Sequence, residues 1–334
     1  MSDTAPPPTR GTMVLRAFAW FMVTAMFAFL LNNYLSFWRD WPGIRALFSG
    51  GEGSVVLSGT QLVLYLVALA GSIWWVGSTR DRALRADWAV MNRLVKVIVR
   101  FAFFAVLLVG LGDAIVSFLR VEGLLADYVG VETAKAWDYN NNRAPQLHLP
   151  LMGAALVLAL VLPTLGFQWL AVLVVIAELS IVLSRFVFSY EQAFQGDLVR
   201  FWYGALFLFA SAYTLHEDGH VRVDVVYAGL TRRAQGAVNA FGCIVMGILF
   251  CWVILYLGMS NAASVINAPL LALETTQSGF GMYVKYLMAG FLAVFGITMM
   301  IQFCGYLLAS AADWRGDPDG LPHHVHGEDA VTEV

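Results

Sequence analysis

The sequence predicts an all-α integral membrane protein with about eight transmembrane helices. Hydrophobic residues make up 59% of the 334 residues and charged residues only 13%, so a soluble domain of this size could not bury its apolar surface. The apolar runs are continuous and lack the alternation of barrel strands, which excludes an outer-membrane barrel. A spanning segment needs about 20 apolar residues and must satisfy its own amides, so the spans are expected to be helices.

Eight apolar segments are long enough to span a bilayer. The fourth and fifth come from one apolar block, Leu149–Phe188, which Pro163, Gly166 and Gln168 interrupt near its middle. These residues predict a tight helical hairpin, and one long kinked helix is the alternative. The predicted spans are residues 14–37, 55–77, 97–118, 149–165, 168–188, 200–216, 236–259 and 284–310.

The basic residues support eight spans. Cytoplasmic loops carry an excess of Lys and Arg, and two loops of this chain are rich in them. Eight spans place both loops, and both termini, on the cytoplasmic side, whereas seven spans would place one basic loop outside. The two loops contain Arg80, Arg82, Arg85, Arg93 and Lys96 after the second span, and Arg222, Arg232 and Arg233 after the sixth.

The chain divides at a long polar loop, 119–148, which this topology places in the periplasm. A polar tail, 1–13, precedes a first span that is long enough to remain uncleaved. Residues 14–165 are expected to form a four-helix extension and 168–310 a second four-helix unit. The charged tail, 311–334, has the composition of a disordered segment.

No catalytic, cofactor or metal site is expected. The segment from His216 to His220 satisfies the zinc-protease pattern HExxH, but Gly219 disfavours a helix there and no third ligand is evident. No histidine lies deep within a predicted span, which disfavours a haem protein. Nucleic acid is not an expected partner. The three cysteines fall in predicted spans as packing residues: Cys243, Cys251 and Cys304.

Two acidic residues inside predicted spans are functional candidates, because a charge in the bilayer is costly. Asp113 lies towards the outer end of the third span, and Glu178 lies near the middle of the fifth. Each could be a proton or sodium site. The favoured interpretation of Glu178 is a polar contact that fixes helix register against a neighbouring subunit, because a single acid without a clustered partner is a poor coupling site.

The segment Ser189–Arg200 is predicted to be amphipathic. Tyr190, Phe194 and Leu198 recur at helical spacing, so the segment suits the outer membrane interface. Asp197 and Arg200 are three residues apart and can pair on a helix. The segment is expected to link two spans and to form a rim that meets a partner.

The stretch Leu183–Asp224 resembles the small membrane subunit, the DctQ-like family, of tripartite ATP-independent periplasmic (TRAP) transporters. The resemblance covers residues 168–310 and is carried by a span ending in Arg-Phe-Val-Phe and by a complete Gly-His-Val-Arg-Val-Asp signature. Departures occur at Glu191, where the family usually has Pro, and at Phe194, where it usually has Trp. The candidate interface residues are Arg185, Phe188, Phe194, Asp197, Arg200, Gly219, His220, Arg222 and Asp224.

The resemblance implies a small permease subunit of an ion-gradient-driven importer in the bacterial inner membrane. Its implied partners are a large DctM-like membrane subunit, a periplasmic substrate-binding protein and the lipid bilayer. The implied role is to brace the large subunit and help dock the binding protein, with no enzymatic activity. The alternatives are a self-contained secondary transporter that uses Asp113 and Glu178, or a membrane redox subunit.

Overall fold

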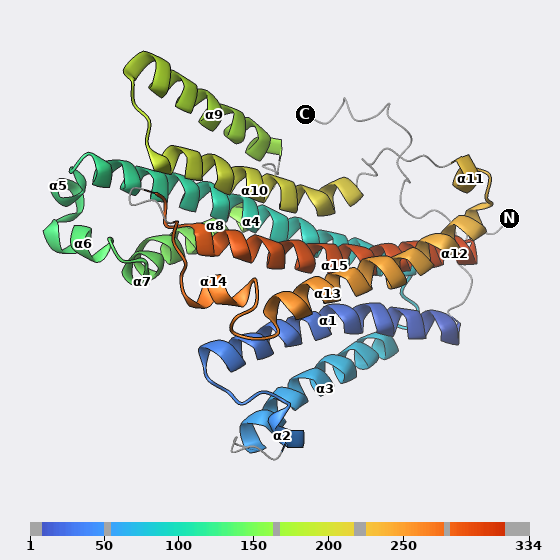
Figure 1. The fold of residues 1–334 in the computed structure, drawn as a ribbon. Coiled ribbons are helices and arrows are strands. Elements are labelled where there is room, and N and C mark those ends of the chain that lie inside the picture. The colour runs from blue at the N-terminus through green and yellow to red at the C-terminus, as the bar shows by residue number, and fades with distance from the viewer. Residues whose placement is uncertain (1–8, 50–54, 163–167, 217–224, 277–280, 318–334) are drawn as a thin grey trace.

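The computed structural model describes residues 9–49, 55–162, 168–216, 225–276 and 281–317, and in these ranges it contains helices and no strands. Figure 1 shows long helices that run back and forth across one bundle, with short helices at its two ends. Seven of the described helices are long and apolar enough to cross a membrane. The predicted all-α membrane class is therefore confirmed.

The long helical segments correspond to the predicted spans one by one. In chain order they are α1 (Arg10–Trp38), α3 (Val55–Ser78), α4 (Leu84–Val121), Asn140–Val161, α9 (Gln168–Phe188), α10 (Ala193–His216), Arg232–Met259 and α15 (Lys285–Arg315). Asn140–Val161 consists of α7 (Asn140–Arg143), the π-helical turn η1 (Ala144–His148) and α8 (Leu149–Val161). Arg232–Met259 consists of α12 (Arg232–Gly242), η2 (Cys243–Ile248) and α13 (Leu249–Met259). The short helices are α2 (Ala46–Ser49), α5 (Leu125–Val129), α6 (Val131–Ala136), α11 (Val225–Ala228) and α14 (Asn267–Leu271).

The sixth predicted span corresponds to α10, a helix of 24 residues. Three polar residues, Gln195, Asp197 and Arg200, lie in its first turns. The segment 189–200 is thus not a separate interfacial helix: α10 begins at Ala193 and its apolar side packs inside the bundle, with Phe194 buried.

The fourth and fifth predicted spans are two separate helices, which confirms the two-span interpretation. Helix α8 ends at Val161, and Leu162 is extended because the residue before a proline, here Pro163, disfavours helical angles. The tight hairpin was wrong in one respect, because α8 packs mainly on α4 and α9 mainly on α10. The two helices therefore do not pair with each other, because each packs against a different neighbour.

Two regions that were predicted to be polar loops are largely helical in the structure. The basic residues Arg85, Arg93 and Lys96 belong to the first half of α4, whose 38 residues extend well beyond a hydrocarbon slab. The predicted loop 119–148 contains α5, α6, α7 and η1, and its last part is continuous with α8. Pro145, which has no backbone N–H to donate, lies in η1, where this continuous helix forms a π-helical turn.

The ends of the outermost helices have local causes. The side chain of Thr9 caps α1 by accepting a hydrogen bond from the amide of Thr12 at 3.3 Å. Helix α15 ends at Gly316, which adopts the left-handed conformation at φ 76° that glycine allows most readily. Figure 1 shows that α1 begins and α15 ends at the same end of the bundle.

Buried ion pairs join the helices at that end. The Arg16 guanidinium contacts the Asp87 carboxylate at 2.7 Å, with both side chains almost fully buried. Arg85 of α4 contacts Asp313 of α15 at 2.7 Å, and Arg232 of α12 contacts the same carboxylate at 2.8 Å. At the basic end, α4 is thus tied to α1 and α15, and α12 is tied to α15.

Two hydrophobic cores hold the bundle together, and both cross the expected boundary near residue 165. One core includes Met26 of α1 and Met91 of α4 together with Leu255 and Met300 from the second half. The other includes Phe103 of α4 with Phe201 of α10 and neighbouring side chains. Since α4 packs against α15, α10 and α8, the first half is an integral part of the fold.

Candidate functional site

Two buried carboxylates hold the short segment that leads into α15, at the end of the bundle opposite Arg10 and Arg315. Asp197 Oδ2 accepts a hydrogen bond from the amide of Met282 at 3.0 Å. Asp113 Oδ2 accepts one from the next amide, that of Tyr283, at 2.7 Å. Arg120 donates to the carbonyl of Gly281 at 3.1 Å. We call these contacts the α15 clamp, because they fix the backbone of Gly281–Tyr283 between α4 and α10.

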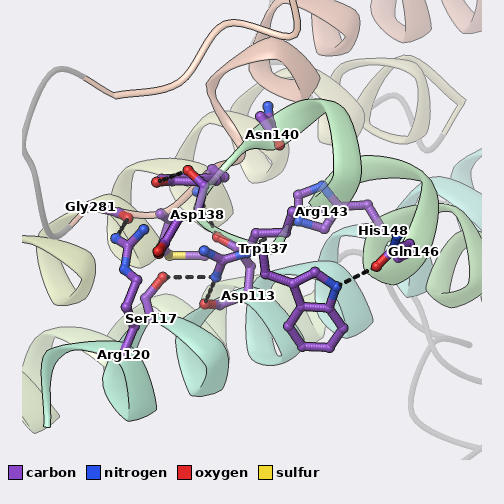
Figure 2. A network of polar contacts seen from close by, with 12 residues as sticks. Asp113, Ser117, Arg120, Trp137, Asp138, Asn140, Arg143, Gln146, His148 and Gly281 are labelled. Carbon is purple, nitrogen blue, oxygen red and sulfur yellow. Dashed lines mark hydrogen bonds and ion pairs between the residues drawn. The ribbon is translucent and has the colours of Figure 1, made fainter. Parts of the chain in front are cut away.

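Asp113 is also the centre of a buried polar network (Figure 2). Its Oδ1 lies 2.7 Å from Nε of Arg143, and both side chains are fully buried. The same guanidinium donates from Nη2 to the carbonyl of Asp113 at 3.0 Å and to Ser117 Oγ at 3.1 Å. A buried charge pair is costly unless additional hydrogen bonds support it; here Nη2 supplies two, whereas Nε and Nη1 make no hydrogen bond with the described residues.

His148 extends this network to α15. Its Nε2 lies 2.9 Å from Asp113 Oδ1, and its Nδ1 lies 2.9 Å from the Tyr286 hydroxyl. A carboxylate only accepts, so Nε2 carries a proton; in the neutral imidazole Nδ1 then accepts the hydroxyl proton of Tyr286. The imidazole and phenol rings also stack, with centroids 5.9 Å apart. One histidine therefore bridges α4 and α15.

The aromatic ring of Tyr283 contributes to the same cluster. The guanidinium carbons of Arg143 and Arg120 lie 4.6 Å and 4.7 Å from its centroid, within the range of cation–π attraction. Its hydroxyl donates to the carbonyl of Asp138 at 2.9 Å. The clamp is thus built from backbone, carboxylate, guanidinium and aromatic contacts on both halves of the chain.

Arg143 and His148 were not recognised from the sequence as site residues. The Asn-rich run before Pro145 was interpreted as a loop, whereas the structure places both side chains on one continuous helix and buries them. The signal that could have found them is the intramembrane position of Asp113, because a carboxylate there requires a cation. Arg143 follows 30 residues later.

The predicted rim residues have different surroundings. Arg185 ends α9 and lies 3.4 Å from the Glu191 carboxylate, with both side chains 60% exposed. Phe188 is exposed, whereas Phe194 is buried against Phe118, with ring centroids 6.3 Å apart. The predicted pairing of Asp197 with Arg200 is present at 3.4 Å, although only Arg200 is exposed.

A second hydrogen bond stabilises the rim. The Tyr190 hydroxyl donates to the Glu122 carboxylate at 2.7 Å. Burial and this neighbouring carboxylate raise the pKa of Tyr190 to about 12, so its hydroxyl remains a donor at neutral pH. The loop that follows α9 is thereby held against the end of α4.

Residues 171–313 match the family model for tripartite ATP-independent periplasmic transporters, DctQ component. This region is a DctQ domain. No curated protein and no solved structure matches the chain. The domain extends from α9 into α15, so it contains Arg185, Asp197 and Tyr283, while Asp113, Arg143 and His148 come from the helical extension that precedes it.

The DctQ domain assigns a class of function. DctQ proteins are the small component of TRAP transporters and are not enzymes. TRAP systems also contain a large membrane subunit and a binding protein. The multi-pass fold and the domain together imply the bacterial inner membrane.

The remaining predicted residues of the DctQ domain lie in two places. Gly219, His220, Arg222 and Asp224 lie outside the described residues, as does the HExxH pattern apart from the backbone of His216. Glu178 lies on α9, where its side chain is exposed. Among the described residues, no group of three or more His, Cys, Asp or Glu side chains could hold a metal ion.

Replacing Asp197 with alanine is expected to loosen the clamp within the DctQ domain. The change removes the acceptor of the Met282 amide, and an unpaired buried amide costs about 1–3 kcal/mol. Hydrogen exchange of the full chain in detergent should show faster exchange at Met282 and Tyr283. Asp197→Asn retains an oxygen acceptor and serves as the matched control. Equal protection of these amides in Asp197→Ala and the wild type would show that the hydrogen bond is dispensable.

Proposed function

We propose that the chain is a TRAP small permease subunit that braces the large membrane subunit and helps to dock the periplasmic binding protein in an ion-gradient-driven importer. The DctQ domain supports the assignment to the small component of a TRAP transporter. The arrangement of the helices supports the bracing role. The described polar groups act on the protein itself: Asp113, Asp197 and His148 hold helices and a loop.

The observation that carries the proposal is the exposed surface of α9. This helix packs mainly on α10, using Leu170 and Ala177, which are buried. Most of its other large side chains face outward, and Figure 1 shows α9 diverging from the rest of the bundle. The exposed apolar side chains include Val172, Val175, Ile176, Leu179, Val182, Leu183, Phe186 and Val187.

Glu178 distinguishes this surface from one that only lipid covers. It lies in the middle of α9 and makes no hydrogen bond or ion pair with any described residue. A carboxylate facing hydrocarbon is costly, and such residues usually face a partner or a water-filled cavity. A polar or basic group of the large subunit would satisfy it, as the sequence-based interpretation of helix register requires.

The proposed orientation places both termini in the cytoplasm. The Arg-rich end of the bundle, with Arg16, Arg85 and Arg232, is then cytoplasmic, in agreement with the positive-inside rule. The α15 clamp, Arg185 and Arg200 fall at the periplasmic end, where a binding protein docks. The exposed Arg185 and Arg200 are suited to an acidic patch on that protein.

The alternative of a self-contained secondary transporter has less support. It requires Asp113 and Glu178 to share a coupling site, but no described interaction joins them. Asp113 is saturated by Arg143, His148 and the Tyr283 amide, whereas Glu178 is exposed on another helix. Asp113 therefore has the environment of a structural carboxylate.

Co-purification with the DctM-like subunit of the same organism tests the proposal. We expect Glu178→Gln to reduce recovery of the complex severalfold while membrane insertion is unchanged. The change removes the charge that pairs with the large subunit, and a polar group left without its partner in an apolar interface costs about 1–3 kcal/mol. Glu132→Gln, which neutralises an exposed acid in α6, is the control. Full recovery with Glu178→Gln would argue against the α9 surface as the contact with the large subunit. Solute transport by the chain alone in proteoliposomes would argue against the subunit role itself.

A further inference from the structure

A pocket of about 320 Å³ lies between the helical extension and α13 of the DctQ domain, and its lining includes none of the residues of the α15 clamp. It lies where α1 and α13 end and α3 begins, which is the same end of the bundle as the α15 clamp. Its inner wall is polar, with Asn32, Asn33 and Gln61, and its sides are aromatic. Neither the family match nor the clamp explains this arrangement.

The three amides of the inner wall are buried, and their donors are in use. The Nδ2 atoms of Asn32 and Asn33 donate to the carbonyls of Gln61 and Met259, at 3.2 Å and 2.7 Å. Since carbonyl oxygens only accept, these bonds fix the orientation of both side-chain amides. Gln61 donates from Nε2 to Ser36 Oγ at 2.9 Å.

The acceptors of this wall are not all in use. Asn32 Oδ1 and Gln61 Oε1 have no hydrogen-bond partner among the described residues, although the two residues are 7% and 1% exposed. Buried polar atoms are nearly always paired, and an exception calls for an explanation. Both residues line the pocket, and the two oxygens themselves are buried beneath its surface, so a ligand that inserts hydrogen-bond donors between the lining side chains would satisfy them.

The mouth of the pocket carries a positive charge. Arg45 lines it and donates from Nη2 to the Tyr256 hydroxyl at 3.1 Å. Arg45 makes no ion pair with a described residue, and the described lining contains no carboxylate. A guanidinium in this position favours an anion such as a phosphate.

The aromatic side walls indicate the source of that anion. Phe29, Phe37 and Trp41 line the pocket, and Phe29 lies nine residues before the end of α1, roughly 13 Å along the helix axis. The pocket therefore continues from a membrane interface towards the hydrocarbon. Aromatic residues at this depth suit the glycerol and upper acyl region of a lipid.

We propose that this pocket binds the headgroup of an anionic phospholipid that carries hydroxyl groups, of the phosphatidylglycerol type. The phosphate pairs with Arg45, and the headgroup hydroxyls donate to Asn32 Oδ1 and Gln61 Oε1. A choline headgroup has no such donors. An ethanolamine headgroup has donors, but it would place a cation beside Arg45 with no carboxylate among the described lining residues to pair with it.

Native mass spectrometry of the full chain in detergent tests the proposal, with dioleoyl phosphatidylglycerol and dioleoyl phosphatidylcholine as probes. We expect the wild type to bind phosphatidylglycerol about tenfold more tightly. Arg45→Ala, at the exposed mouth where folding is not at stake, should remove most of this preference, and Gln61→Leu should weaken it. Arg39→Ala, a cation in the same connection outside the pocket lining, should leave it unchanged.

Three results with the two lipids would overturn the proposal. These are equal binding of the two lipids, an unchanged preference in Arg45→Ala, or an equal loss in Arg39→Ala. Free glycerol 1-phosphate is included as a competitor with the same polar groups. If it alone binds as tightly as the lipid, the lipid assignment is overturned and the site belongs to a soluble hydroxylated anion.

Discussion

Asp113→Ala is expected to be the most destabilising single substitution in the bundle. It leaves Arg143 buried without its counter-charge, and breaking a buried ion pair in this way typically costs about 3–5 kcal/mol. It also removes the acceptors of His148 Nε2 and of the Tyr283 amide. Thermal unfolding of the detergent-solubilised chain should show a large fall in midpoint, with reduced accumulation in the membrane.

The double substitution Asp113→Leu with Arg143→Met separates charge from packing. Replacing both partners of a buried pair with apolar residues is often neutral or stabilising, so the double variant should be more stable than Asp113→Ala. Its clamp would still lack the acceptor for the Tyr283 amide. A double variant that is less stable than Asp113→Ala would show that the pair is not the main source of the effect.

Gly236→Val is the second substitution with a large expected effect. A Cβ atom at Gly236 would lie 2.6 Å from the backbone nitrogen of Trp314 and 2.7 Å from the carbonyl oxygen of Ser310. Backbone atoms cannot move aside as a side chain can, so α12 and α15 must separate. Small residues allow this kind of close helix contact in membranes, and overpacking costs roughly 1–3 kcal/mol or more.

The matched control is Gly242→Val, on the same helix, where an added Cβ meets no atom within 4 Å. We expect Gly242→Val to unfold at the wild-type temperature and Gly236→Val to unfold well below it. Similar midpoints for the two variants would show that α12 and α15 do not need this close approach.

Hydropathy and charge were sufficient to predict the helical class and the positions of the long helices. These properties are local, since a run of apolar residues must cross the bilayer whatever it packs against. The motif at Arg185 and the residues around it were likewise sufficient for the family resemblance that the match to residues 171–313 supports. The interruption at Pro163 correctly predicted two helices.

The contacts between helices could not be predicted in this way. The pairing of Asp113 with Arg143, His148 and Tyr283 depends on residues 30 to 170 positions away, and hydropathy carries no information about such distances. Arg143 and His148 were assigned to a loop because Asn and Pro favour turns, whereas packing against α4 keeps that segment helical. Asn32 and Gln61 were overlooked for the same reason.

The order in which these groups leave the ribosome has a further consequence. Asp113 and Arg143 are 30 positions apart, whereas the Tyr283 amide lies 170 positions after Asp113. At synthesis rates of about 5–20 residues per second, that interval is roughly 10–30 s. During this time Arg143 is available to neutralise the carboxylate inside the nascent bundle. We therefore expect Arg143 to pair with Asp113 first. The hydrogen bond from the Tyr283 amide can form only when translation is almost finished.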